Sequence, residues 1–257
     1  TLVTEPGGHI ARLHRNFRSN PEINRLAECI LAGDAAGARM LVEAARTVEL
    51  IDFDGWVDPV SLAPVRADLL ESVVAVVSAA ERGEAGHAIA ALSAHRILCG
   101  HREGPFGVGH WARASRSWLA TQLSDYGYDS RPYVGQPLLI QRNTDLFHNG
   151  DTAVVITSDG GGLVAAVDRP EGPFMVAPSL LDDAADLHAM TIHKSQGSQF
   201  DAVSVVLPPS GSALLTRELI YTAVTRARGR VRMYGSWERL EEAIATPVRR
   251  ASGLARH

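Results

Sequence analysis

The feature that most constrains the fold of this chain is an alternation of short apolar runs with amphipathic helical segments. Residues 187–192 (LHAMTI) and 202–208 (AVSVVLP) are apolar enough for strands that are buried on both faces. A helical pattern follows at 216–228, then a strand-like run at 231–236 and a last helix. Strands that alternate with helices form a parallel sheet with helices on its faces. The sequence therefore predicts an α/β fold.

A different texture interrupts this pattern between about residues 132 and 181, which are rich in Gly, Pro, Val and Asp. Short apolar runs are separated there by turn signals. The strongest are HNGD (148–151) and DGGG (159–162), because Asn-Gly and Gly-Gly tolerate positive φ. We expect a small all-β unit, 132–181, inserted into an α/β domain made of 1–131 and 182–257.

The N-terminal part supplies further elements of the α/β pattern. Residues 9–18 alternate apolar and polar side chains, as a strand does. Asn20 is placed to cap a helix, Pro21 suits its first position, and Gly33 suits its end. The chain begins without Met, and we expect it to be the C-terminal piece of a longer protein.

The composition narrows the class of protein. The length of 257 residues with 46% hydrophobic content is enough for one large domain or two small ones. The net charge of −4 indicates no overall preference for nucleic acid, but it averages over faces and is compatible with a basic groove. Cys29 and Cys99 form no CxxC pattern, so reduced thiols in a cytoplasmic protein are expected. No apolar run reaches the roughly 18–20 residues that span a membrane.

Two pairs of conspicuous side chains are interpreted structurally. His101 and His110 flank a glycine-rich loop but have no third ligand, so no metal site is predicted. Trp111 and Trp118 are seven residues apart, on one face of a helix, which favours packing in the core over stacking on nucleic-acid bases.

The segment TIHKSQGSQFD (191–201) contains Lys194 and Ser195, the pair that ends a phosphate-binding loop. Lys194 is also the only lysine in the chain. A P-loop needs Gly directly before that lysine and a second Gly five residues before the first, but position 193 is His. The chain therefore has no P-loop, and it has no obvious acidic pair after a strand to hold Mg²⁺.

Three segments, in this order, resemble motifs IV, V and VI of the second motor domain of superfamily 1 helicases. They are HRNFRSN (14–20), TIHKSQGSQFD (191–201) and ELIYTAVTRAR (218–228), the last expected to be a helix carrying both of its arginines. HREGPFGV (101–108) and the tail AIATPVRRASGLA (243–255) are similar to the RecD family, the alpha subunits of exodeoxyribonuclease V. The resemblance extends from about residue 9 to the C-terminus.

This resemblance implies the second RecA-like motor domain of an ATP-dependent 5′→3′ DNA helicase subunit, with the β-rich insert as a small SH3-type barrel. ATP and Mg²⁺ would be held mainly by a first motor domain outside this chain, so the chain alone is expected to hydrolyse ATP negligibly. The implied partners are single-stranded DNA and RecB-like and RecC-like subunits, in a complex that resects double-strand breaks. No membrane partner is implied.

The resemblance also implies roles for individual residues. Arg226 matches the motif VI arginine finger, and Arg18 matches a motif IV arginine near the γ-phosphate. A guanidinium suits both, because it is always charged and can bind two oxygens at once. Three residues would border the ATP cleft, although the family often has Glu at the last of these positions: Gln196, Gly197 and Gln199.

Other residues match DNA contacts in the family. Thr191, His193 and Lys194 match contacts to the DNA backbone at the end of a strand. In the insert, Arg142 and Asn143 resemble a DNA-contacting region, although Arg142 is equally compatible with a structural ion pair. The HNGD segment is more simply explained as a hairpin turn.

Three other functions are compatible with parts of the sequence. The chain would be a non-catalytic single-stranded-DNA-binding or scaffold module if no P-loop accompanied it. It would alternatively belong to a stand-alone RecD-like helicase, against which the RecD-like tail argues. A nucleotide-dependent enzyme unrelated to DNA is disfavoured, because the chain has neither a P-loop nor a G-x-G-x-x-G pattern.

Overall fold

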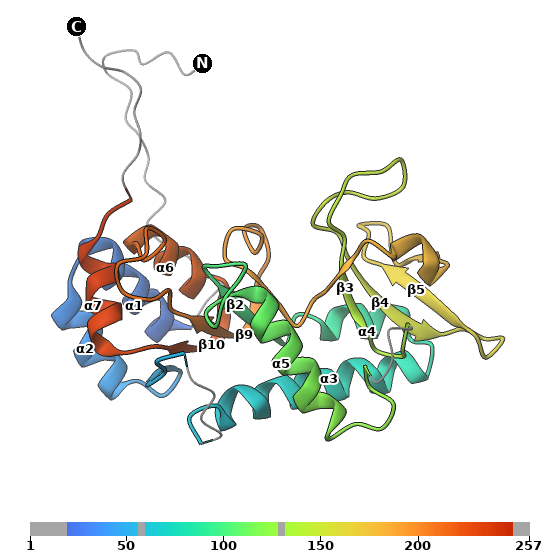
Figure 1. Cartoon of the computed structure of the whole chain (residues 1–257), viewed down its shortest axis with the longest axis horizontal. Coiled ribbons are helices and arrows are strands. Elements are labelled where there is room, and N and C mark those ends of the chain that lie inside the picture. The colour runs from blue at the N-terminus through green and yellow to red at the C-terminus, as the bar shows by residue number, and fades with distance from the viewer. Residues whose placement is uncertain (1–19, 56–59, 128–131, 249–257) are drawn as a thin grey trace, which may run out of the picture.

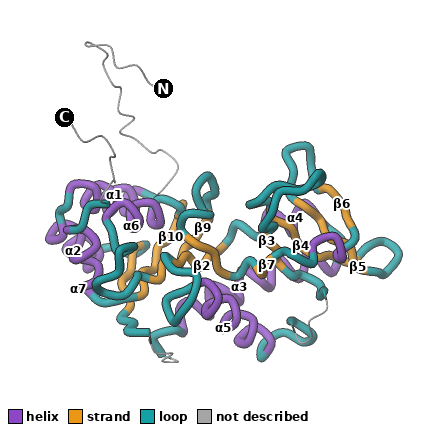
Figure 2. The backbone as a smooth tube through the Cα atoms, turned by 45° about the horizontal axis from the view of Figure 1, so that its top comes forward, coloured by secondary structure: helices purple, strands orange, loops and turns teal. Residues whose placement is uncertain are grey.

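The computed structural model describes residues 20–55, 60–127 and 132–248. The molecule is elongated, with a parallel sheet and its covering helices toward one end and an antiparallel sheet at the other (Figure 1). Figure 2 shows the strands of the two sheets as two separate groups. The predicted α/β class is confirmed by the first sheet.

The parallel sheet has the strand order β1-β10-β9-β2-β8, and all its pairings are parallel. β9 is central: its Ala202 is in register with His95 of β2, and its Val203 with Val231 of β10. The strand bounds are β1 Val48–Ile51, β2 His95–Cys99, β8 Ala189–Thr191, β9 Phe200–Val206 and β10 Ala227–Tyr234.

Helices cover both faces of this sheet. On one face, the strands share a hydrophobic core with α1 Pro21–Ala32, α2 Ala35–Ala44, α6 Arg217–Val224 and α7 Trp237–Ala245. On the other face, Val65 of α3 (Ala63–Glu81) and Trp111 of α5 (Val108–Ala120) pack against Ile97 and Tyr234. Trp111 is 1% exposed, which confirms its predicted place in the core. None of the helices in the described ranges is both long and apolar enough to cross a lipid bilayer.

The predicted helix signals act as expected. The Asn20 side chain accepts a hydrogen bond from the Glu22 N–H at 2.9 Å, and α1 ends at Gly33, whose φ of 73° is left-handed. The Thr216 hydroxyl accepts from the Leu219 N–H at 3.4 Å and caps α6. However, α6 ends at Val224, so Arg226 follows the helix and Arg228 lies in β10. The expectation of one helix carrying both arginines was wrong.

The second sheet is antiparallel, with the order β6-β5-β4-β3-β7. One of its faces packs on its own core around Phe147 and Val155, and the other packs on α3 and α4 (Ala85–Ala91). DGGG forms the turn between β4 and β5, as predicted. The bounds are β3 Pro137–Leu139, β4 Thr152–Thr157, β5 Leu163–Val167, β6 Phe174–Val176 and β7 Ala185–Asp186, with a 3₁₀ turn at Pro178–Leu181.

A buried carboxylate joins α3 to the parallel sheet. Asp68 of α3 is 7% exposed and accepts hydrogen bonds from Arg230 (2.6 Å) and Arg232 of β10. Arg232 also donates to Glu49 of β1 at 2.9 Å. Two arginines neutralise the buried charge, which would otherwise be costly to remove from water.

We expect Asp68→Ala to lower the free energy of unfolding by about 3–5 kcal/mol, because it leaves two arginines without their buried partner. The matched control is Asp201→Ala, which removes an exposed carboxylate 3.5 Å from Arg228 and should cost less than about 1 kcal/mol. Urea titration of both variants measures the difference. Equal effects would show that the buried network does not stabilise the fold.

Two buried histidines also lie in the structural core. His95 Nε2 is 2.9 Å from the Ser204 hydroxyl oxygen, and His188 Nε2 is 2.9 Å from the Tyr126 hydroxyl oxygen. Burial lowers the pKa of His95 from 6.5 to about 3, and burial also lowers the pKa of His188. Both rings are therefore neutral in the folded protein at neutral pH.

These pKa shifts predict a loss of stability in acid. Between about pH 6.5 and the lowered folded-state pKa values, the unfolded chain binds more protons than the folded one, so stability falls as pH falls. Each histidine contributes a slope of up to about 1.4 kcal/mol per pH unit. Urea titrations at about pH 7 and about pH 5 should show a smaller difference for His95→Gln than for the wild type. The control His87→Gln, at an exposed ring, should keep the wild-type difference. A His95→Gln profile as steep as that of the wild type would contradict this account.

Candidate nucleotide and DNA interface

The segment 192–199 connects β8 to β9 and runs from the carboxyl edge of the parallel sheet to its amino edge. It leaves the carboxyl end of β8, where Thr191 pairs with Cys99, and Cys99 pairs in turn with Val206 of β9. It then enters β9 at Phe200, six residues before Val206. At about 3.3 Å per residue, the segment crosses roughly 20 Å of sheet. Residues at its two ends therefore face opposite edges of the same sheet.

Internal hydrogen bonds hold this segment in consecutive turns. The Ser195 N–H donates to the carbonyl oxygens of Thr191 and Ile192, both at 3.2 Å, and the buried Ser195 hydroxyl donates to the Ile192 oxygen at 2.7 Å. The Ser198 N–H donates to the Ser195 oxygen at 3.0 Å. Gly197 has a φ of 92°, a left-handed conformation that other residues rarely adopt. The segment is thus a defined connection whose shape depends on Gly197.

Arg226 contacts the end of this segment at the amino edge of the sheet. Its guanidinium donates to the Ser198 carbonyl oxygen (3.2 Å), the Thr222 carbonyl oxygen (3.1 Å) and the Thr225 hydroxyl (3.3 Å). Its own carbonyl oxygen accepts the Phe200 N–H at 2.8 Å. In the described ranges no carboxylate pairs with Arg226, and burial lowers its pKa. Its positive charge is therefore held in place by neutral oxygens and stays available to an anion.

The residues expected at an ATP cleft differ in their environment. Gln196 and Gly197 are exposed and lie close in sequence to the Ser198 oxygen that Arg226 contacts. Gln199 is half-buried and lines a cavity of about 200 Å³ together with Lys194 and Arg96. Thr152 of β4 and Asp168, the residue after β5, line the same cavity. Gln199 thus faces the junction between the two sheets.

The residues expected to contact DNA gather partly at the carboxyl edge. The Thr191 hydroxyl accepts the Lys194 N–H at 3.3 Å, and His193 beside them is exposed. The Lys194 ammonium donates to the Gln141 side-chain oxygen at 2.5 Å, which links this edge to the antiparallel sheet. Burial lowers the pKa of Lys194, and the nearby Arg102 guanidinium lowers it further.

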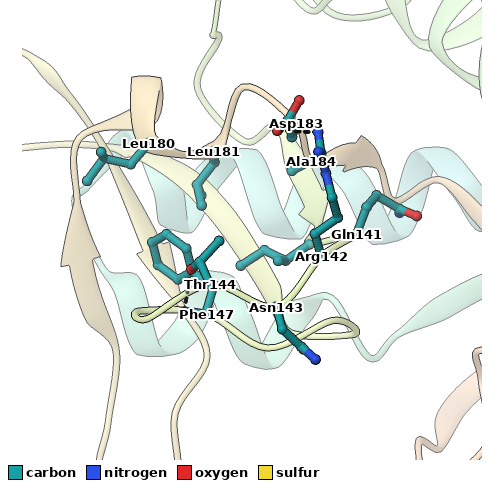
Figure 3. A pocket seen from close by; sticks show the side chains of 10 residues that line it. Gln141, Arg142, Asn143, Thr144, Phe147, Leu180, Leu181, Asp183 and Ala184 are labelled. Carbon is teal, nitrogen blue, oxygen red and sulfur yellow. Dashed lines mark hydrogen bonds and ion pairs between the residues drawn. The ribbon is translucent and has the colours of Figure 1, made fainter.

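Arg142 and Asn143 already have partners in the fold. Arg142 forms an exposed ion pair with Asp183 at 2.5 Å, beside a pocket of about 190 Å³ that Phe147 and Leu181 line (Figure 3). The Asn143 side-chain oxygen accepts the Asn149 N–H at 2.7 Å.

The HNGD segment is a turn, as predicted. It contains Gly150 with a φ of 102° and is fixed by Asp151, which pairs with Arg169 at 2.6 Å.

Arg18 lies outside the described residues. Asn20, two positions later, donates its N–H to the Arg228 carbonyl oxygen at 2.7 Å, so α1 begins beside the first residues of β10. Sequence reasoning gave no role to Gln141 or Arg102, which the structure brings to Lys194. The position of Arg102 three residues after a buried strand was the available signal, because parallel strands end at a common edge.

Comparison with known proteins decides the family. Residues 186–234 match the family described as UvrD-like helicase C-terminal domain. The chain is 43% identical over 248 residues to the RecBCD enzyme subunit RecD of Mycobacterium tuberculosis, a match that covers 95% of this chain. The chain is a RecD homologue.

A second RecD, from Mycolicibacterium smegmatis, is 40% identical over 247 residues. The match again covers 95% of this RecD homologue. The chain spans 42% and 43% of the length of these two RecD proteins. A solved structure of a Bacteroides Pif1 helicase is 14% identical, with a TM-score of 0.38, over 87% of this chain and 51% of that one. The helicase-family match covers β8, segment 192–199, β9, α6 and β10, the elements that hold Lys194 and Arg226.

We expect Gly197→Ala to lower the free energy of unfolding by about 1 kcal/mol, because alanine is strained at this left-handed φ. Open space surrounds the position where a Cβ would be added, so a clash would not contribute. Gly160→Ala is the matched control: Gly160 lies in the β4–β5 turn without a positive φ. Urea titration should find the control close to wild type. An unchanged Gly197→Ala variant would show that the segment adapts its backbone freely.

Proposed function

We propose that this chain is the second motor domain of an ATP-dependent 5′→3′ DNA helicase subunit, in a complex that resects DNA double-strand breaks. The observation that carries the proposal is the place of Arg226, which is fixed by neutral oxygens at one end of segment 192–199. Thr191, His193 and Lys194 lie at the other end. Homology to RecD and the match to a helicase C-terminal domain also support a second motor domain.

On the nucleotide side, Arg226 is the proposed arginine finger. A fixed guanidinium stabilises negative charge on a phosphoryl group in transfer, and such a group contributes roughly 10³–10⁵ to the rate where it has been measured. The chain has no P-loop lysine, so its residues fit only this part of an ATP site. ATP, whose hydrolysis supplies the free energy, and Mg²⁺ would be held mainly by another motor domain. Arg18 is proposed to approach the same phosphates, with Gln196, Gly197 and Gln199 bordering the cleft.

On the DNA side, Thr191, His193 and Lys194 are proposed to contact the backbone of a single strand. A hydroxyl, an imidazole and an ammonium are suitable donors for phosphate oxygens. The antiparallel sheet without its edge strand β7 lies in the proposed SH3-type insert, 132–181, within a motor domain of 1–131 and 182–257. Arg142 and Asn143 are proposed to extend the DNA track onto it, with Arg142 exchanging its exposed pairing to Asp183 for a phosphate.

The RecD relatives are named as subunits of the RecBCD enzyme, so we propose RecB-like and RecC-like partners in the cytoplasm. The second candidate function is a non-catalytic module that binds single-stranded DNA, which the missing P-loop favours. The stand-alone RecD-like helicase is the third, and the high coverage of this chain by RecBCD-type RecD disfavours it. Loss of ATP turnover on substitution of Arg226 separates the motor from the binding module.

In the complete subunit, we expect Arg226→Ala to reduce DNA-stimulated ATP turnover by roughly 10³-fold or more while nucleotide binding is largely kept. The matched control is Arg228→Ala: Arg228 lies two residues away, is exposed and pairs with Asp201. It should turn over ATP at close to the wild-type rate. Steady-state hydrolysis and equilibrium binding of a fluorescent ATP analogue give the two readouts. Turnover by Arg226→Ala at the wild-type rate would refute the arginine-finger assignment.

A further inference from the structure

Two basic residues follow neighbouring strands at the carboxyl edge of the parallel sheet. β2 and β8 are neighbours there, with Cys99 in register with Thr191 and the Ile192 N–H donating to the Cys99 oxygen at 2.9 Å. Arg102 follows Cys99 by three residues, and Lys194 follows Thr191 by three residues. The two chain segments therefore leave the sheet side by side and carry a cation at corresponding positions. Arg102 is close enough to lower the pKa of Lys194.

These two cations lack a counter-ion in the part of the chain that the structure describes. The Arg102 side chain is exposed and forms no ion pair or hydrogen bond there, and Lys194 donates to the neutral side chain of Gln141. The carboxylate of Glu103 lies next to Gly109, where the Arg113 guanidinium also lies. Only burial and Arg102 shift the pKa of Lys194, and no acid offsets them. An anion that binds between two such cations lowers the free energy, because it offsets their mutual repulsion.

The loop that carries Arg102 is built into the fold. The Gly109 N–H donates to the Arg102 carbonyl oxygen at 2.9 Å, and the Trp111 indole donates to the Pro105 oxygen at 3.1 Å. Phe106 packs edge-on against Phe53, with ring centroids 5.8 Å apart. Because this loop is held at several points, little conformational entropy would be lost when Arg102 binds a ligand.

We propose that Arg102 and Lys194 together form a binding position for backbone phosphate of single-stranded DNA, at the carboxyl edge of β2 and β8. The proposal rests on the proposed function and adds Arg102, from a different loop, to the DNA track. Lys194 contacts Gln141, two residues after β3, and Arg142 follows directly in sequence. A continuous strand of phosphates matches this row of donors, whereas a free phosphate would occupy only one position of it.

The test is a titration of a fluorescent oligothymidylate with the complete subunit, as the wild type and as the Arg102→Gln and Arg39→Gln variants, over a series of salt concentrations. Loss of one phosphate contact should weaken binding and reduce the slope of log K against log salt by about 0.7. Arg39→Gln removes the same charge from an exposed arginine that pairs with Glu43 on α2, and should bind like the wild type. Arg102→Lys should restore part of the slope, because it restores the charge without the guanidinium fork.

The outcomes separate this inference from the proposed function. If the wild type binds oligothymidylate with a salt-dependent affinity and Arg102→Gln binds identically, the Arg102 position is refuted and the proposed function stands. If the wild type binds no oligothymidylate, both are refuted. A parallel titration with pyrophosphate identifies the source of the phosphate. If Arg102→Gln weakens binding of pyrophosphate but not of oligothymidylate, the site takes a free phosphate and the inference is wrong.

Discussion

The short crossover 192–199 is the constraint on which the other features of the site depend. It must return from the carboxyl end of β8 to the amino end of β9, past the intervening strand β2, in eight residues. The turns centred on Ser195 and the left-handed Gly197 achieve this. Because both ends are hydrogen-bonded into the sheet, Thr191 at the carboxyl edge and Arg226 at the amino edge are held by one connected piece of backbone. A displacement at either end has a direct physical route to the other.

The rest of the fold keeps this crossover in place. β9, the strand it enters, is central in the sheet, and the Phe200 N–H is fixed by the Arg226 oxygen. On the far side of the sheet, Asp68 clamps α3 to β10, the strand that begins directly after Arg226. The same α3 packs on the antiparallel sheet, so this buried carboxylate connects the helix beneath that sheet to the strand that begins after Arg226.

Much of this arrangement could be predicted from local sequence, because its signals are local. The cap at Asn20, the left-handed Gly33 and the apolar run of β9 each act within a few residues. The sequence predicted the start of β10 at residue 231, which is too late, because the first half of the strand, Ala227–Arg230, is polar. Arg230 in this half pairs with Asp68, about 160 residues away in sequence, which no local pattern can reveal. The contact of Lys194 with Gln141 and the electrostatic influence of Arg102 on Lys194 were missed for the same reason, since they depend on which strands are neighbours. β6 and β7, with three and two residues, are too short to give a periodic signal.

We propose that segment 192–199 transmits DNA binding at the carboxyl edge to Arg226 at the amino edge. Amide hydrogen exchange, resolved by residue, with and without oligothymidylate tests it most directly. The account predicts that bound DNA slows exchange along the segment, including the Phe200 N–H that donates to the Arg226 oxygen. Protection confined to Thr191–Lys194, with Ser198 and Phe200 exchanging at unchanged rates, would contradict it.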